Sequence, residues 1–583
     1  MKIIQENKWL TWVHQLINFR LVAQSVLLIS TFVLLKRIVT RGTLDMPQRL
    51  RKALPDSPAD SLIPYEEWTM FGSALLDPRY FIVFAVFTSA SFMFCRSISW
   101  SAYGRMTRVF VCFAVAIMTW INFSYGYNLY VDQAHILDRV LILSLCIATF
   151  LYPAFIAPFI CVALLSVSQF AYPLGGHSLT GAQMPLDVMF LFSAFHLNMI
   201  GKQVLSRLTI FVRTWRRRSG RIGARCFSYA LSRPRWLLVG LNGRLFFFVL
   251  LCMVGSAYLI PALHKIEISP SGTEWLLQNS LDRHVAGSVL RDNHFFFSEG
   301  GGETALILAQ KFGRFLVIVT MIIEISALLI VVNRRLSFLI LMLLAFLHIG
   351  ICTLSGIFFW KWALLDLLLA GLILTREARP VFTRQAFALS IVLMLSATLH
   401  FSPIALGWFD TSLIKTYRLI VTTDEGDEFV ISGSSMKPYE SYFTSERFGF
   451  LNPQGKLAGM DTTTDFEVAD EINRMETADI ASRLQEAAVS DAPEIDQDES
   501  ERFDRFIKRY FGNWNRKLDR DLMPFDFVRS SPHILSGNSE GAFQWDRRVA
   551  RVDVYYETAH YDGETVIPLG VHLIRRIDIP PQQ

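Results

Sequence analysis

Long runs of apolar residues recur along the first 407 residues, and they constrain the fold of this chain more than any other feature. A membrane-spanning helix needs about 20 mostly apolar residues, and several of the runs are shorter. Pro153 divides one stretch, which is either two tight spans or one kinked span. The runs cover residues 17–35, 80–95, 109–124, 140–152, 154–172, 186–201, 243–263, 312–332, 336–353, 354–375 and 386–407. They predict an all-α polytopic membrane bundle of about ten or eleven spans over residues 1–407.

Charge divides the chain at the same boundary. Residues 408–583 hold 32 acidic and 20 basic side chains, a net of −12, whereas residues 1–407 hold 19 acidic and 36 basic ones, a net of +17. Basic loops between membrane spans, followed by an acidic soluble domain, account for that division. The overall charge of +5 therefore does not indicate a nucleic-acid partner.

The arginine-rich stretch 202–235 sets the expected orientation, because short loops rich in Lys and Arg stay in the cytoplasm. Alternation of the spans then puts the N-terminus in the cytoplasm and residues 408–583 on the extracytoplasmic side. The loop 39–79 is an exception, since it falls outside although it carries Arg41, Arg49, Arg51 and Lys52. This pattern predicts a multi-pass protein of a bacterial inner (plasma) membrane.

The acidic domain, residues 408–583, has the pattern of an α+β fold. Two pairs of alternating segments flank turns rich in Asp and Gly, which is typical of β-hairpins. None of the seven cysteines lies in this domain, so disulfides do not stabilise it. The expected elements are hairpins of Thr416–Val421 with Phe429–Ser432 and of Ala550–Glu557 with Thr565–Ile574, helices over 465–488 and 500–517, and a solvated acidic linker, Asp491–Glu499.

Lys265 is the first candidate for chemistry, because it lies at the extracytoplasmic end of the apolar run 243–263. Polar groups at membrane depth are costly and so mark candidate functional sites. A lysine covered by the following loop, which contains Trp275, would be partly desolvated. Burial disfavours the charged form and would make the amine a general base. The alternative is a lysine that extends its ammonium group to the membrane surface.

His348 and Glu324 are the second candidate, since they lie inside two successive apolar runs. An imidazole and a carboxylate on neighbouring helices could hydrogen-bond across the bundle. Such a pair would either hold the helices together or orient a catalytic or quinone-binding group. Asp366 and Lys361 lie near the same helices, and Lys361 is expected at the membrane interface.

A metal site is not expected. His264, His284 and His294 share one loop, but spacings of twenty and ten residues match no zinc-ligand motif. The sequence also contains no HExxH, Walker or nucleophile-elbow motif.

Several short motifs resemble those of the horizontally transferred transmembrane (HTTM) domain family, which includes the membrane part of vitamin K-dependent gamma-carboxylase. Asn18-Phe19-Arg20-Leu21 opens the first span as a Phe-Arg pair does in that family. Tyr258–Ile266, followed by Trp275, resembles the family's Tyr-x-x-Ala-Gly-x-x-Lys-Leu…Trp segment. His348–Trp360 resembles its His-x-x-x-x-x-Leu…Gly-x-Phe segment. Tyr417-Arg-Leu-Ile-Val lies where the carboxylase begins its lumenal β-rich domain, so the similarity extends over residues 17–432.

The resemblance implies a quinone or hydroquinone cofactor among the helices of residues 243–375. Lys265 would be the base that takes a proton from the hydroquinone, which then reacts with oxygen to form the base that deprotonates a peptide glutamate. His348 would be the second catalytic residue, and Glu324, Trp275 and Trp360 would bind the cofactor. The expected partners are membrane lipid and a secreted peptide or protein recognised by the acidic domain.

The chain departs from the family pattern in ways that put carboxylase activity in doubt. Pro261-Ala262 stands where the family has Ala-Gly, and the gap from Lys265 to Trp275 is longer. The region starting at His135 matches poorly the helix that carries a functional histidine in the carboxylase, and residues 154–205 look like an insertion. Activity does not follow from the fold alone. Two alternatives stay open: a non-catalytic membrane partner in secreted-peptide maturation, and a transporter.

Overall fold

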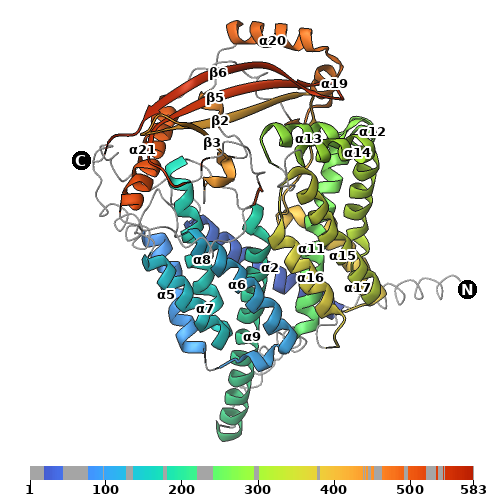
Figure 1. The fold of residues 1–583 in the computed structure, drawn as a ribbon. Helices are drawn as coiled ribbons and strands as arrows, with labels where there is room; N and C mark the ends of the chain where they lie inside the picture. Colours follow the sequence, from blue (N-terminus) through green and yellow to red (C-terminus); the bar gives the residue numbers. More distant parts are fainter. Residues whose placement is uncertain are drawn as a thin grey trace, which may run out of the picture.

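In the part of the chain that the structure describes, eleven helices form a bundle, and a four-stranded sheet with its own helices covers one end of it (Figure 1). The computed structural model describes residues 19–43, 77–95, 97–125, 136–174, 180–219, 241–293, 301–376, 381–436, 439, 442–443, 448–451, 462–490, 497–519, 533–535, 543 and 545–581. The sheet and the C-terminal half of the longest helix lie at opposite ends of the bundle.

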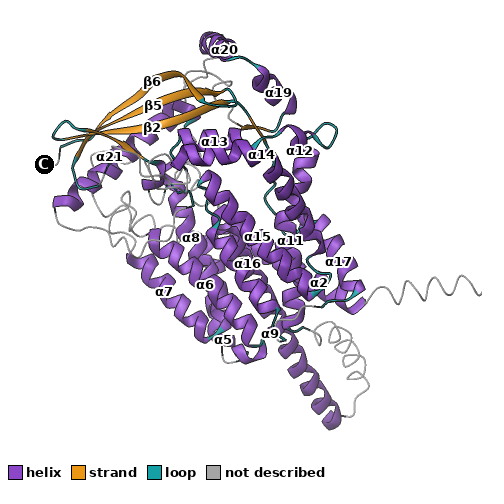
Figure 2. Cartoon of the chain, turned by 45° about the vertical axis from the view of Figure 1, so that its right-hand side comes forward, coloured by secondary structure: helices purple, strands orange, loops and turns teal. Residues whose placement is uncertain are grey.

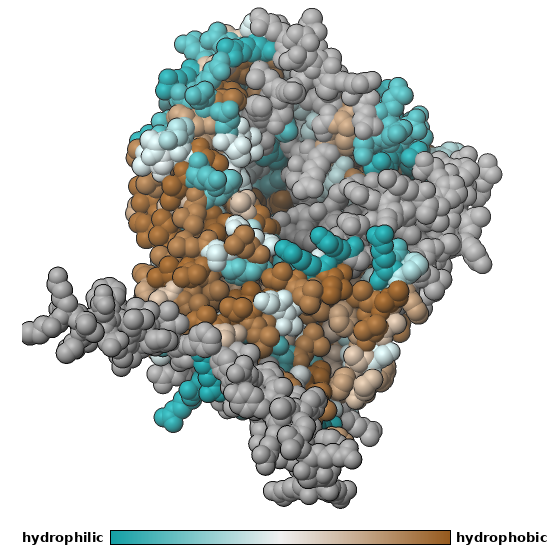
Figure 3. Space-filling view, turned by 180° about the vertical axis from the view of Figure 1, so that it is seen from behind, coloured by the Kyte–Doolittle hydropathy of each residue, from teal (hydrophilic) through white to brown (hydrophobic). Residues whose placement is uncertain are grey.

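The bundle consists of α2 (Phe19–Thr43), α5 (Pro78–Phe94), α6 (Arg105–Tyr125), α7 (Ile136–Leu151), α8 (Ile156–Leu174), α9 (Thr180–Ser219), α11 (Gly243–Glu267), α14 (Gly301–Ser326), α15 (Arg334–Ser355), α16 (Trp360–Ile373) and α17 (Arg384–Leu395). Among the described residues, six helices are long and apolar enough to cross a membrane: α2, α6, α9, α11, α14 and α15. Large apolar side chains are exposed on the outside of the bundle, and Figure 3 shows them as a broad band below the hydrophilic end.

Short polar side chains begin several of these helices. Asp77, Asn242 and Asn333 each accept hydrogen bonds from two backbone N–H groups in the first turn of α5, α11 and α15. These bonds satisfy N–H groups that have no partner within the helix. Gly356 ends α15 in the left-handed conformation (φ 69°), which glycine adopts at low cost.

The helices differ from the predicted spans at two places. Residues 140–172 form two helices, α7 and α8, because the chain turns at Tyr152 and Pro153. This resolves the question left open by Pro153. The last predicted span, 386–407, is wrong in length, since α17 ends at Leu395 and the chain continues through a short 3₁₀ turn, Ala397–Leu399, to strand β1 (Phe409–Asp410).

The C-terminal domain is built on an antiparallel sheet in the order β3-β2-β5-β6. Both predicted hairpins are confirmed: β2 (Leu413–Thr423) pairs with β3 (Glu428–Ile431), and β5 (Val549–Tyr561) pairs with β6 (Val566–Asp578). Strand β2 also pairs with β5, which joins the two hairpins into one sheet.

Helices cover this sheet. The predicted helix over 465–488 is two helices, α19 (Phe466–Arg474) and α20 (Thr477–Ser490). The second predicted helix is α21 (Gln497–Asp519), which packs aromatic residues on the sheet side facing the bundle (Figure 2). The part of the acidic linker at 491–496 lies outside the described residues.

Several polar contacts fix the domain on the bundle. Two short helices, α12 (Glu274–Gln278) and α13 (Leu281–Leu290), lie between the end of α11 and the sheet (Figure 1). The hydroxyl of Tyr561 donates to Asp282 at 3.1 Å, and Gln310 donates to that hydroxyl at 3.1 Å. Arg291 donates to the carbonyl oxygen of Lys415 at 3.1 Å.

Candidate functional site

A set of ionisable side chains lies buried where α11, α14, α15 and α16 meet, toward the end of the bundle that the sheet covers. Lys265, Glu324, His348 and Asp366 are all at most 8% exposed. Tyr258, on α11, is 4% exposed and lies among them. Burial of so many polar groups within an apolar bundle is costly unless they pair, so their pairing defines the site.

Lys265 forms an ion pair with Glu324 between α11 and α14. Its Nζ atom donates to both carboxylate oxygens, at 2.7 and 2.6 Å. The same Nζ lies 4.8 Å from the ring centre of Trp275, which the ammonium approaches in a cation–π contact. Lys265 is therefore covered by the Trp275 loop, as the sequence predicts, but it is neutralised by Glu324.

The Trp275 loop is itself held in place. The indole N–H of Trp275 donates to the carbonyl oxygen of Trp408 at 2.8 Å, and its backbone N–H donates to the Ser269 hydroxyl at 3.0 Å. A side chain at Gly407 would come within 3.2 Å of the Lys265 backbone nitrogen, so this part of the chain passes close over the end of α11. The Trp275 loop and the chain at Gly407 therefore cover the Lys265–Glu324 pair at this end of α11.

Tyr258 connects the second pair of ionisable groups. Its hydroxyl lies 2.7 Å from Nε2 of His348 and donates a short hydrogen bond to Oδ2 of Asp366. The phenol has one proton, so when that proton faces Asp366 the hydroxyl oxygen must accept from a protonated Nε2 of His348. In neutral His348, Nδ1 then carries the free lone pair.

Two atoms of this cluster have no hydrogen-bond partner within the described part of the chain: Nδ1 of His348 and Oδ1 of Asp366. Buried polar atoms without a partner are rare and are an indication of a ligand or a reaction site. The Glu324 carboxylate also acts electrostatically on the Tyr258 hydroxyl, so the ion pair and the Tyr258 cluster are neighbours.

Aromatic rings line the Tyr258 cluster. The ring centre of His348 lies 5.1 Å from that of Phe359 and 5.9 Å from that of Trp362. Trp360 points elsewhere, with its ring 5.2 Å from Trp120 of α6. Lys361 lies 5.3 Å from the Trp360 ring and is 8% exposed, so it is more buried than an interfacial lysine.

The C-terminal domain adds a residue that the sequence did not single out, His533. Its carbonyl oxygen accepts from the backbone N–H of Phe358 at 2.6 Å, and the N–H of Leu535 donates to the carbonyl oxygen of Gly356 at 2.8 Å. The His533 ring lies 4.9 Å from the Phe359 ring, which in turn contacts His348. Residues 533–535 therefore lie over the α15–α16 connection, next to the buried cluster. Their distance in sequence from the spans hides this relationship.

The predicted partnership of His348 with Glu324 is wrong. Glu324 pairs with Lys265, whereas His348 pairs with Tyr258. The two residues do not meet because each faces a different side chain of α11. Tyr258 is present in the sequence motif but was not assigned a role there. The loop histidines are separate: His264 lies 3.5 Å from Glu267 and His284 lies 3.3 Å from Asp410, while His294 falls outside the described residues.

Comparison with known proteins adds no assignment. No family model matches the chain, and no match was found among curated proteins or solved structures.

Proposed function

We propose that the chain is a polytopic integral membrane protein with an extracytoplasmic C-terminal domain. Six apolar helices and the exposed apolar side chains around the bundle support this proposal, because such a surface suits lipid better than water. Four shorter apolar helices, α5, α7, α8 and α17, bring the number of proposed spans to ten, of the ten or eleven expected.

The orientation rests on the distribution of charge. Gln203 donates to the carbonyl oxygen of Ser97 at 2.8 Å, which places the C-terminal half of α9 beside the segment between α5 and the first turn of α6. Both segments are rich in arginine and lie at the end of the bundle opposite the sheet. Retention of basic loops in the cytoplasm then puts the sheet on the outer side of a plasma membrane.

We infer that the buried site handles a proton of a lipophilic, hydroquinone-like molecule. The observation that carries this inference is the unpartnered Nδ1 of His348, buried beside Tyr258 and Asp366. In the proposed step, Nδ1 accepts the proton of the ligand's O–H group, which leaves an oxyanion and an imidazolium. Asp366 stabilises the imidazolium through the Tyr258 hydroxyl, as a carboxylate does in other proton relays.

Lys265 receives a different role from the free base expected from the sequence. Because Lys265 already donates short hydrogen bonds to both carboxylate oxygens of Glu324, its amine is not available as a free base. We assign it to stabilising negative charge on the ligand, with Trp275 covering it. In this assignment Lys265 keeps the position of the lysine in the HTTM-type site, but it stabilises charge instead of acting as the base.

Membership of the HTTM type is part of the same proposal. Its support is that Tyr258, Lys265 and His348, which carry the resemblance, come from two separate stretches of sequence and lie in one buried site. The C-terminal domain would bring a secreted peptide or protein to this end of the bundle. The position of residues 533–535 over the α15–α16 connection supports that arrangement.

The test is a mass-spectrometric inventory of lipophilic molecules bound to protein purified from membranes in mild detergent. We expect the wild type to retain a quinone, and His348→Phe and Lys265→Met to lose it. Lys36→Met is the matched control, since Lys36 forms an ion pair of the same length, 2.6 Å, with Asp187 elsewhere in the bundle. Equal quinone retention in all four proteins would rule out this site.

A further inference from the structure

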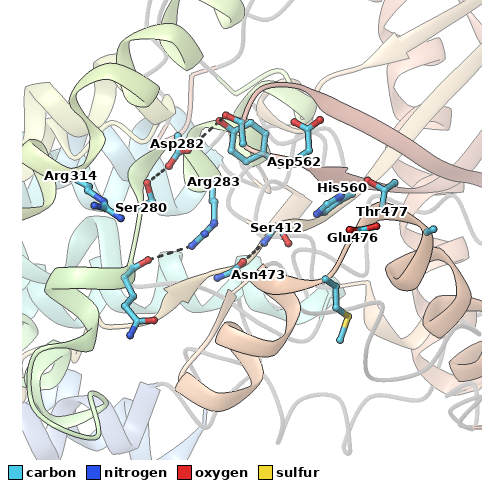
Figure 4. A pocket seen from close by; sticks show the side chains of 15 residues that line it. Ser280, Asp282, Arg283, Arg314, Ser412, Asn473, Glu476, Thr477, His560 and Asp562 are labelled. Atoms are coloured by element: carbon cyan, nitrogen blue, oxygen red, sulfur yellow. Dashed lines mark hydrogen bonds between the residues drawn. The ribbon is translucent and has the colours of Figure 1, made fainter.

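A cleft of about 570 Å³ lies between the bundle and the C-terminal domain, away from the buried site. Its volume is in the range of small-molecule sites, roughly 300–1,000 Å³. One wall comes from α12, α13 and α14 and carries Arg283 and Arg314 (Figure 4). The other wall comes from the C-terminal domain and carries Glu476, His560 and Asp562.

The two guanidinium groups form the anion-binding feature of the cleft. Burial lowers the pKa of Arg283. The negative charges of Asp282 and Asp410 oppose this effect, and Arg314, as a like charge, adds a smaller decrease. Asp282, which also lines the cleft, accepts hydrogen bonds from the Ser280 and Tyr561 hydroxyls. Arg283 donates a long bond, 3.4 Å, to the carbonyl oxygen of Gln278. A bound anion would give both arginines a charged partner.

The opposite wall has the complementary charge. Glu476 is exposed to the cleft, and Asp562 lies in the turn between β5 and β6. The His560 imidazole is held by the Thr477 hydroxyl at 2.8 Å, and burial lowers the pKa of His560, so this histidine adds no positive charge near neutral pH. Among the lining residues, the bundle side therefore carries two arginines and one carboxylate, Asp282, whereas the domain side carries the carboxylates Glu476 and Asp562.

Apolar side chains border the cationic wall. Phe315 follows Arg314 directly and is 63% exposed, and Ile318 on the same side of α14 is 42% exposed. Leu277 precedes the lining residue Gln278 and is 62% exposed. If the bundle lies in a membrane, these side chains face acyl chains while the two arginines sit at headgroup level.

We propose that the cleft binds the headgroup of an aminophospholipid, with the phosphate on Arg283 and Arg314 and the ammonium group toward Glu476 and Asp562. The acyl chains would lie over Phe315 and Ile318. This inference rests on the proposed membrane insertion. A bound lipid would touch both the bundle and the domain, and it would stabilise the sheet against the membrane-facing helices.

The test compares lipid binding by delipidated full-length protein, measured by native mass spectrometry in detergent. The probes are phosphatidylethanolamine, phosphatidylglycerol, phosphatidylcholine and glycerophosphoethanolamine, which has the headgroup but no acyl chains. We expect phosphatidylethanolamine to bind best. Loss of two charge-assisted contacts in Arg283→Gln/Arg314→Gln should weaken that binding about tenfold or more. Glu476→Gln should remove the preference over phosphatidylglycerol.

Arg335→Gln is the matched control, because Arg335 is an exposed arginine at the first turn of α15, outside the cleft. Equal binding of the three phospholipids, or binding that the double variant does not weaken, would overturn the proposal. Binding of glycerophosphoethanolamine as strong as that of phosphatidylethanolamine would overturn the lipid assignment. Absence of the wild type from the membrane fraction would instead contradict the proposed function, so the two failures are distinguishable.

Discussion

Tyr258 and Lys265 lie two turns apart on the same face of α11, and each connects that helix to a different buried carboxylate. Tyr258 donates to Asp366 of α16, and Lys265 donates to Glu324 of α14. Seven residues of α-helix rise about 10 Å, so the two clusters are stacked along one side of the helix. Variants at Lys265 and Tyr258 therefore distinguish a structural role of each residue from a functional one.

The Lys265–Glu324 pair predicts an asymmetry between single and double variants. Lys265→Met and Glu324→Met each leave a buried charge without its partner, which costs about 3–5 kcal/mol in comparable pairs. Lys265→Met/Glu324→Met removes both charges and should recover most of the lost thermal stability, measured by unfolding in detergent. Quinone retention should not recover with it. A double variant as unstable as the singles would mean that the pair itself is required for folding.

Tyr258→Phe tests the link between His348 and Asp366. The variant keeps the ring but leaves the His348 Nε2 and Asp366 Oδ2 atoms without their shared partner. We expect a loss of about 1–3 kcal/mol in unfolding free energy, the cost of unsatisfied buried polar groups. The double variant Tyr258→Phe/Asp366→Asn should lose less than the sum of the two single changes, because both act on one hydrogen-bonded unit. Additive losses would show that the two residues act independently.

The apolar pattern of the sequence predicted the helices well, because a run of apolar residues about as long as a membrane span favours a helix whether its side chains face lipid or the bundle interior. Both hairpins of the C-terminal domain followed from alternation around Asp-Gly turns. Partnerships across the bundle were not predictable in this way. The sequence predicted His348 as the partner of Glu324, whereas the partner is Lys265. Residue spacing along one helix does not show which side chain of a neighbouring helix a residue will face. His533 could not be found at all, because its approach to His348 depends on how the domain packs on the bundle.

Gly255 lies where α11 passes close to its neighbours. A Cβ atom there would lie 2.6 Å from the Met394 sulfur and 3.2 Å from the carbonyl oxygen of Ala327. Because the Ala327 backbone cannot move aside, we expect Gly255→Ala to lower the unfolding free energy by about 1–3 kcal/mol. Gly350→Ala is the matched control in α15, where a Cβ would meet nothing within 4 Å. That change should be neutral or stabilise by up to about 1 kcal/mol. Similar melting temperatures for both variants in detergent would contradict this account of the packing.

The contact between residues 533–535 and the α15–α16 connection should weaken as the pH falls. Burial, with the positive charge of Lys361 as a smaller cause, lowers the pKa of His533 to about 3. A released histidine has a pKa of about 6.5, so the docked state binds fewer protons between those values. Docking is therefore fully stabilised above about pH 6.5 and is progressively lost as the pH falls below it. His348 also contacts the Phe359 ring. Neutral His348 carries no charge, so it does not change the predicted direction of the pH dependence.

Hydrogen exchange of the Phe358 and Leu535 amides measures this docking, because both N–H groups bond across the contact. After correction for intrinsic exchange rates, their protection should fall between pH 7.5 and pH 5.5 in the wild type. His533→Gln carries no titrating group at that position and should show protection that is independent of pH over the same interval. The backbone bonds at Phe358 and Leu535 do not depend on the imidazole, so the variant keeps the contact and serves as its own control. A pH-dependent loss of equal size in His533→Gln would assign the effect to another group and remove His533 as its source.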